Sequence, residues 1–147
     1  MASTVSSSTL TVSITEELEL NGRNVGGTNV HKINGINEVS KRILTAATAG
    51  TTVLALDATA GAGTFIRDDV KYIRITNLDN TNQVRLAIIN AGTDVHVLVN
   101  ALDSFIITNG VCKSEADGES IVMENISSLK AYGLTASVDV EIFVASV

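Results

Sequence analysis

Asp94 and His96 are the two side chains best spaced to do chemistry together. They stand two residues apart in residues 94–99, where valines alternate with other residues. Side chains two apart on a strand share a face, so this carboxylate and imidazole could form an acid/base dyad or two ligands of a metal ion. Either site needs further convergent groups, and the sequence places none. We therefore interpret the pair as the solvated face of a strand, and interpret His31, which follows a glycine-rich segment, in the same way.

The one cysteine, Cys112, is the next candidate. It precedes Lys113, and a nearby cation lowers the pKa of a thiol and makes it more reactive. A cysteine nucleophile also needs a base, and no local motif supplies one. We expect an inert thiol, and a lone cysteine excludes a disulfide framework within the chain.

Three short motifs could bind ions. AGAG at residues 60–63 could be a phosphate loop, but it lacks the Lys-Ser/Thr pair and the helix start that such a loop requires. IRDD at residues 66–69 and NLDN at residues 77–80 carry carboxylates, whereas Ca²⁺ takes about six to eight convergent oxygens. We therefore expect no catalytic residue, no metal and no cofactor, and predict that the chain is not an enzyme.

Charge and composition limit the classes of partner that the chain is expected to bind. The chain of 147 residues has a net charge of −6, from 10 Lys and Arg against 16 Asp and Glu, and only 3% of its residues are aromatic. Scattered cations and few aromatic rings do not supply a nucleic-acid interface. No apolar run approaches the roughly 18 residues of a membrane span, and the first residues do not resemble a signal peptide. We predict no nucleic-acid partner and no membrane partner.

Alternating apolar and polar residues predict strands along most of the chain. Leu10, Val12 and Ile14 share one face, which predicts a half-buried strand that could run as far as Leu20. Residues 71–88 are the most regular stretch, because two alternating runs flank the polar patch TNLDNTNQ. Asn and Asp favour turns, so we predict a β-hairpin here and interpret the patch as its turn rather than as a site.

The remaining strands give the fold. We predict them at about residues 38–45, 51–57, 95–99, 104–108 and 138–144. Together these are about eight short strands with turn residues between them, which favours an all-β, antiparallel, jelly-roll-like β-sandwich. An immunoglobulin-like sandwich is the alternative fold, although this sequence lacks the tryptophan that such sandwiches usually contain. The predicted organisation is a flexible N-terminal arm over residues 1–9 and a single sandwich domain over residues 10–147.

Three segments considered together carry a family resemblance. They are TVSITEELELNG with GGTN and INEVSKRI, then VKYIRITNLDNTNQVRLAI, and finally ISSLKAYGLTASVDVEIFVAS. This combination resembles small virion structural proteins of tailed phages that infect marine bacteria, the cyanophage type in particular. The resemblance covers most of the chain, from Thr11 to Ser146. It implies a β-sandwich unit that assembles as an oligomer on the particle.

From this resemblance we expect a capsid decoration (cement) protein. It would be located on the virion, assembled in the host cytoplasm, and would bind the major capsid protein or other virion proteins as a homo-oligomer, a trimer. It would stabilise the assembled head by mass action. Contact with the capsid is expected through one sandwich face and the N-terminal arm, at Ala2, Ser3, Thr4, Val5, Ser6, Ser7, Ser8 and Thr9.

Three alternatives stay open. A tail, fibre or baseplate component would use the same kind of sandwich. A carbohydrate-binding module would stack sugars on aromatic rings, and Tyr72 and Tyr132 are the only tyrosines in the sequence. An enzyme on a cupin-like barrel would hold a metal with several histidines, and His31 and His96 stand in unrelated contexts.

Overall fold

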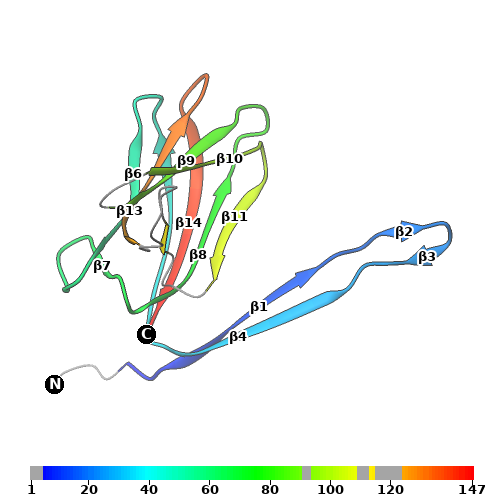
Figure 1. Cartoon of the computed structure of the whole chain (residues 1–147), viewed down its shortest axis with the longest axis horizontal. Helices are drawn as coiled ribbons and strands as arrows, with labels where there is room; N and C mark the ends of the chain where they lie inside the picture. The colour runs from blue at the N-terminus through cyan, green and yellow to red at the C-terminus, as the bar shows by residue number, and fades with distance from the viewer. Residues whose placement is uncertain (1–4, 91–93, 109–112, 115–123) are drawn as a thin grey trace, which may run out of the picture.

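A computed structural model of the chain describes residues 5–90, 94–108, 113–114 and 124–147 (Figure 1). Every regular element in these ranges is a β-strand, and none of the described residues forms a helix that is long and apolar enough to cross a membrane. Most strands form two sheets that pack face to face. A long two-stranded hairpin extends away from them (Figure 1).

The two sheets contain eight strands of five or more residues. One sheet has the order β10-β9-β13-β6, with short strands β7 and β12 at its margins, and the other has the order β11-β8-β14-β5. The bounds are β5 (Glu38–Ala46), β6 (Thr51–Asp57), β7 (Phe65–Ile66), β8 (Val70–Asn77), β9 (Val84–Asn90), β10 (Asp94–Val99), β11 (Ser104–Thr108), β12 (Lys113–Ser114), β13 (Glu124–Gly133) and β14 (Val138–Ser146).

The order of the strands is that of a jelly roll. Among successive long strands only β9 and β10 pair with each other, and every other connection crosses from one sheet to the other. The long strands pair in antiparallel fashion throughout. The predicted antiparallel, jelly-roll-like sandwich is therefore confirmed.

Inward-facing side chains of both sheets make one core. Every second residue of β14 is at most 1% exposed from Val138 to Val144, and Leu86 and Leu129 of the opposite sheet are fully buried. This is the alternation of a strand with one face in a core and one face outside. The apolar pattern of the sequence and the burial in the structure agree here residue by residue.

The predicted hairpin over residues 71–88 is wrong. Both strands exist, but β8 lies in one sheet and β9 in the other, so the polar patch joins the two sheets. The side chain of Asn77, only 1% exposed, donates to the carbonyls of Asn82 and Asn100, and its oxygen accepts the amide of Asp79. The carboxylate of Asp79 accepts the amides of Thr81 and Asn82 at 2.7 and 2.6 Å. The interpretation as a turn-forming patch holds, since these polar groups bond the loop itself.

The first part of the chain forms the long hairpin, residues 8–36. Strand β1 (Ser8–Thr15) pairs with β4 (Thr28–Ile36), and β2 (Glu19–Leu20) pairs with β3 (Arg23–Asn24) in the same continuous register. Asn21 and Gly22 form its tip, with φ values of 52° and 74°. Two successive positive φ values are typical of a type I′ turn, whose twist suits a two-residue hairpin loop. The half-buried strand predicted from Leu10 is therefore one arm of a hairpin, and the returning arm was not predicted from the sequence.

Candidate interaction surfaces

The base of the long hairpin packs across the outer face of the sheet β11-β8-β14-β5. Its apolar side chains meet a second hydrophobic cluster, separate from the core of the sandwich, made by Leu10, Val12, Ile33 and Ile36 of the hairpin with Tyr72, Ile106, Phe143, Ala145 and Val147. The rings of Tyr72 and Phe143 meet edge to face, with centroids 5.9 Å apart. Burial raises the pKa of the Tyr72 hydroxyl. This cluster anchors the hairpin to the sandwich.

Beyond that anchor the hairpin has no partner among the described residues. Its distal half, defined here as residues 14–30, leaves the sandwich on the side of β11 (Figure 1). The apolar side chains there are 46–58% exposed, namely Ile14, Leu18, Leu20, Val25 and Val30. At about 3.3 Å per residue, the segment from Ile14 to the turn extends about 23 Å. A lone two-stranded hairpin is marginally stable in water, so this half has little support of its own.

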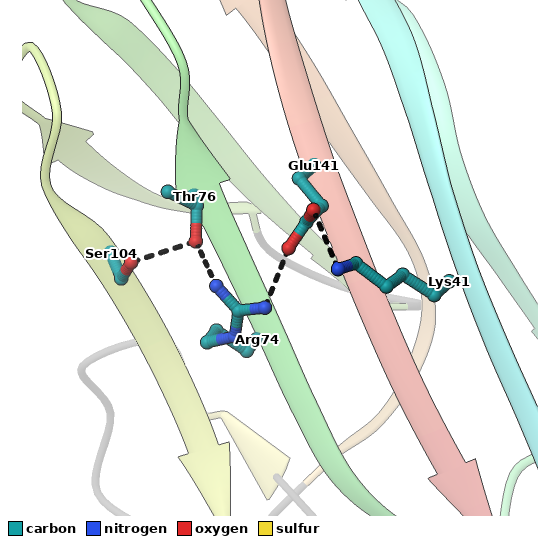
Figure 2. Close-up of polar contacts among 5 residues, drawn as sticks. All are labelled: Lys41, Arg74, Thr76, Ser104 and Glu141. Atoms are coloured by element: carbon teal, nitrogen blue, oxygen red, sulfur yellow. Dashed lines mark hydrogen bonds and ion pairs between the residues drawn. The ribbon is translucent and has the colours of Figure 1, made fainter. Parts of the chain in front are cut away.

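A polar network crosses the same sheet beside the anchor (Figure 2). Arg74 on β8 donates to Glu141 on β14 at 2.6 Å and to the Thr76 hydroxyl at 2.5 Å. Lys41 on β5 lies 3.2 Å from the other oxygen of Glu141, and the Thr76 and Ser104 hydroxyls share a hydrogen bond of 2.7 Å. The network thus joins all four strands of the sheet.

The charges of this network are partly compensated. The hydrogen bond from Arg74, followed by that from Lys41, holds the pKa of the Glu141 carboxyl below its ordinary value. One carboxylate serves two cations, so a net positive charge remains at the centre of the sheet. Arg74 also lines a groove between the sheet and the hairpin, whose other walls are Leu10, Thr11, Val12, Ser13, Tyr72 and Phe143.

Strand β5 is one of the two edge strands of this sheet, and β11 is the other. Within the described part of the chain β5 pairs only with β14. Its outward side chains Val39 and Ile43 are 55% and 61% exposed, and Lys41 stands between them. Arg42 reaches the opposite sheet, where it donates to the carbonyl of Val53 at 2.8 Å. An exposed edge with apolar side chains is a template for pairing with another chain.

No protein-family model, curated protein or solved structure matches this chain. The long hairpin is anchored on the sheet that β5 borders, and neither of these two surfaces was identified as a site from the sequence. The signal for the hairpin was present as an apolar alternation that continues into a stretch rich in glutamate.

The candidate chemical residues are not brought together. His31 is on β4 in the long hairpin, whereas His96 is on β10 in the other sheet, where it shares the exposed face of the strand with Asp94 as expected. The acidic motifs around Asp69 and Asp79 lie at opposite ends of β8. Among the described residues no group of three or more His, Cys, Asp or Glu side chains could hold a metal. Cys112 lies outside the described residues.

The predicted N-terminal contact segment is partly described. Ala2, Ser3 and Thr4 lie outside the described residues. Residues 5–9 are exposed, and Ser8 and Thr9 already belong to β1. The Thr9 hydroxyl donates to the side-chain oxygen of Asn34 at 2.9 Å, across the hairpin. The segment therefore leads directly into the base of the long hairpin.

The two tyrosines considered for sugar stacking are both engaged by protein groups. Tyr72 is 5% exposed within the anchoring cluster. The Arg85 guanidinium lies 4.3 Å from the ring centroid of Tyr132. Gly50 approaches the same ring so closely that a Cβ at this position would lie 2.3 Å from it. Neither ring offers the open face that stacking on a sugar would use.

Proposed function

We propose that this chain is a structural protein of a tailed-phage particle, a decoration (cement) protein that binds the assembled head and stabilises it. The long hairpin is the observation that carries the proposal. Its distal half exposes five large apolar side chains on an element with little support of its own. A protein that acts by assembly uses such an element, because binding covers it.

The energy scale fits a binding role. Complete burial of one large aliphatic side chain contributes roughly 1.5–3 kcal/mol, so covering the remaining half of each contributes roughly 1 kcal/mol. Five such side chains on the hairpin offset a large part of the cost of association. A partner that binds only the assembled shell then raises the stability of that shell by mass action.

The fold and the sequence support the same role. Jelly rolls are used in viral capsids and in other protein classes, so the fold is compatible with a virion role without specifying it. The resemblance to phage virion proteins is the reason to place the proposed role on a phage particle. The proposal includes three copies around a threefold axis, with the major capsid protein contacted by residues 2–9 and by one face of the sandwich.

The test uses particles of the phage that encodes the chain. Mass spectrometry and cryo-electron microscopy of purified particles should find many copies over the head. Particles that lack the chain should release DNA at a lower temperature, and purified protein added back should restore the release temperature. A few copies at one vertex would instead support the tail, fibre or baseplate alternative, and absence from the particle would refute the proposal.

A matched pair of variants tests the contact segment. Deletion of residues 2–7 leaves β1 intact, because this strand begins at Ser8. We expect the deletion variant to keep its thermal unfolding temperature and to lose binding to bare heads. Substitution of Lys130, on β13 in the other sheet, by Glu is the control for an unrelated surface change. Undiminished head binding by the deletion variant would contradict a contact through residues 2–7.

A further inference from the structure

The distal half of the long hairpin is a charged surface as well as an apolar one. Glu16, Glu17 and Glu19 stand there against the single cation Arg23, in a stretch whose residues are exposed. The chain as a whole is also acidic, with a net charge of −6. A partner for the hairpin therefore has to offer a local basic surface next to apolar side chains.

The chain itself carries such a surface on β5. Lys41 and Arg42 are adjacent at the centre of this free edge, between the exposed side chains of Val39 and Ile43. Arg74 adds a third cation two strands away, and Glu141 is the carboxylate that faces Lys41 and Arg74. Glu38 at the start of β5 and Asp139, which accepts the Thr45 hydroxyl near the end of β5, are further carboxylates beside this strand, so the positive charge is confined to its centre at Lys41 and Arg42.

The two surfaces lie at opposite edges of one sheet. The order β11-β8-β14-β5 places the free edge β5 at one side, and the hairpin leaves the molecule on the side of β11 (Figure 1). The hairpin is anchored over Tyr72, Ile106 and Phe143 and then leads outwards, so it does not fold back onto its own β5. A contact between the hairpin of one copy and β5 of the next is head-to-tail, because it joins two different surfaces. Contacts of this kind close into a ring when the rotation between neighbouring copies fits a closed ring.

We propose that the distal half of the long hairpin of one copy docks along β5 of a second copy of this chain. The contact places Glu16, Glu17 and Glu19 near the Lys41 and Arg42 of the neighbour, and covers the apolar side chains of both elements. It adds strand pairing to an edge that is otherwise open. This inference rests on the proposed function, to which it gives the contact that joins the copies of the oligomer.

A charge exchange tests the contact on the full-length protein. Light scattering after size exclusion should give an oligomer of the 15.4 kDa chain. The triple change Glu16→Lys, Glu17→Lys and Glu19→Lys should weaken association at least about tenfold, as should Lys41→Glu with Arg42→Glu. Combining both sets should restore it, since the charges are then exchanged. Lys130→Glu, on the other sheet, should leave association unchanged.

Cysteine pairing tests the same contact without changing charge. In a Cys112→Ser background, Leu18→Cys on the hairpin and Ile43→Cys on β5 should crosslink between copies under mild oxidation. Two single variants should crosslink when mixed and give far less product alone, because the contact joins different surfaces. Leu18→Cys with Leu98→Cys, on β10 of the other sheet, is the control and should not crosslink efficiently.

The outcomes separate this inference from the proposed function. A monomer at micromolar concentrations, or an oligomer that neither the charge exchange nor the cysteine pair affects, would overturn the docking of the hairpin on β5. If the chain is nevertheless abundant on heads, the proposed function stands without this contact. If the contact is present and no particle contains the chain, the proposed function fails and the docking stands.

Discussion

Strands β14 and β1 have the same pattern of residues and opposite surroundings. Both alternate aliphatic and polar side chains. In β14 the aliphatic residues Val138, Val140, Ile142 and Val144 are at most 1% exposed. In the long hairpin the aliphatic face is half-buried at Leu10 and Val12, and becomes exposed from Ile14 onwards. The difference lies in what faces each strand.

This contrast separates what the residue pattern of a strand specifies from what covers its apolar face. An alternating pattern specifies an extended strand with one apolar face, whatever covers that face. For β14 the cover is the opposite sheet of the same chain. For the distal hairpin no described residue of the chain provides it, and we propose that another molecule does. Substitutions in the two regions should therefore differ widely in their effects on folding and on association.

Truncation in the sandwich core should have the largest effect. Leu86 is fully buried between the sheets, and Leu86→Ala removes its contacts and leaves a cavity. We expect a loss of about 2–5 kcal/mol in the free energy of unfolding. Urea denaturation followed by circular dichroism measures it. A loss below about 1 kcal/mol would show that the core is less tightly packed than described.

Removal of the buried side-chain amide of Asn77 should cause the second largest loss of stability. Asn77→Ala leaves the carbonyls of Asn82 and Asn100 and the amide of Asp79 without this partner. We expect a loss of about 1–3 kcal/mol, because buried polar groups lose their hydrogen bonds. The same denaturation experiment measures the change, and Asn80→Ala in the exposed part of the loop is the control. Equal stability of the two variants would contradict a structural role for the amide.

The pH dependence of unfolding reports on the polar network. The pKa of Glu141 is lowered in the folded protein from its ordinary value of 4.5 by Arg74 and then Lys41. A carboxyl with a lowered pKa stabilises the fold above the unfolded pKa, and this contribution is lost as the pH falls towards the folded value. The unfolding temperature should therefore fall as the pH drops below about 4.5, and less steeply in Glu141→Gln. Parallel pH curves would contradict this role for the network.

Truncation at the tip of the hairpin should have the smallest effect on folding. Leu20 is 58% exposed, and Leu20→Ser should change the free energy of unfolding by less than about 0.5 kcal/mol. The same change should weaken self-association, which light scattering measures. The contrast with Leu86→Ala would disappear if Leu20→Ser destabilised the monomer as strongly.

Removal of residues 15–28, which are most of the distal half, should leave the base of the hairpin undisturbed. Paired residues alternate between hydrogen-bonded and open pairs in an antiparallel ladder, and Glu16 donates its amide to the carbonyl of Gly27. Ile14 and Asn29 therefore form the next hydrogen-bonded pair, which can close a two-residue turn. Replacement of residues 15–28 by Asn-Gly should keep the fold and abolish self-association. An oligomer of unchanged mass would show that other surfaces join the copies.

Most of the sandwich could be predicted from the sequence, because its strands alternate cleanly. Strands β5, β6, β10, β11 and β14 were predicted within two residues at each end. Strand β13 was missed, since bulges near Ile126 and between Leu129 and Lys130 break its alternation. The predicted count of about eight agrees with the sandwich, with β13 in place of the first predicted strand, which is part of the long hairpin.

Which strands pair with each other could not be predicted in the same way. The polar patch between β8 and β9 has turn chemistry, and turn chemistry is the same whether a connection joins neighbours or crosses between sheets. Only long-range contacts decide, and one sequence does not show them. The interaction surfaces were missed for a related reason, because exposure of Leu18 or Ile43 depends on which strands lie beside them.

The pairing of β5 with β14 has a consequence for synthesis of the chain. Within the described parts of the chain, the first strand of the sandwich pairs only with the last, and Glu38 stands opposite Ser146. Sheets with such distant partners fold slowly, because the intervening chain must be ordered first. Until the ribosome releases the final strand, β5 has neither its neighbour nor its place in a sheet. The long hairpin is synthesised earlier than β14, so under the proposed docking a nascent chain displays its hairpin before its own β5 has a place in the sheet.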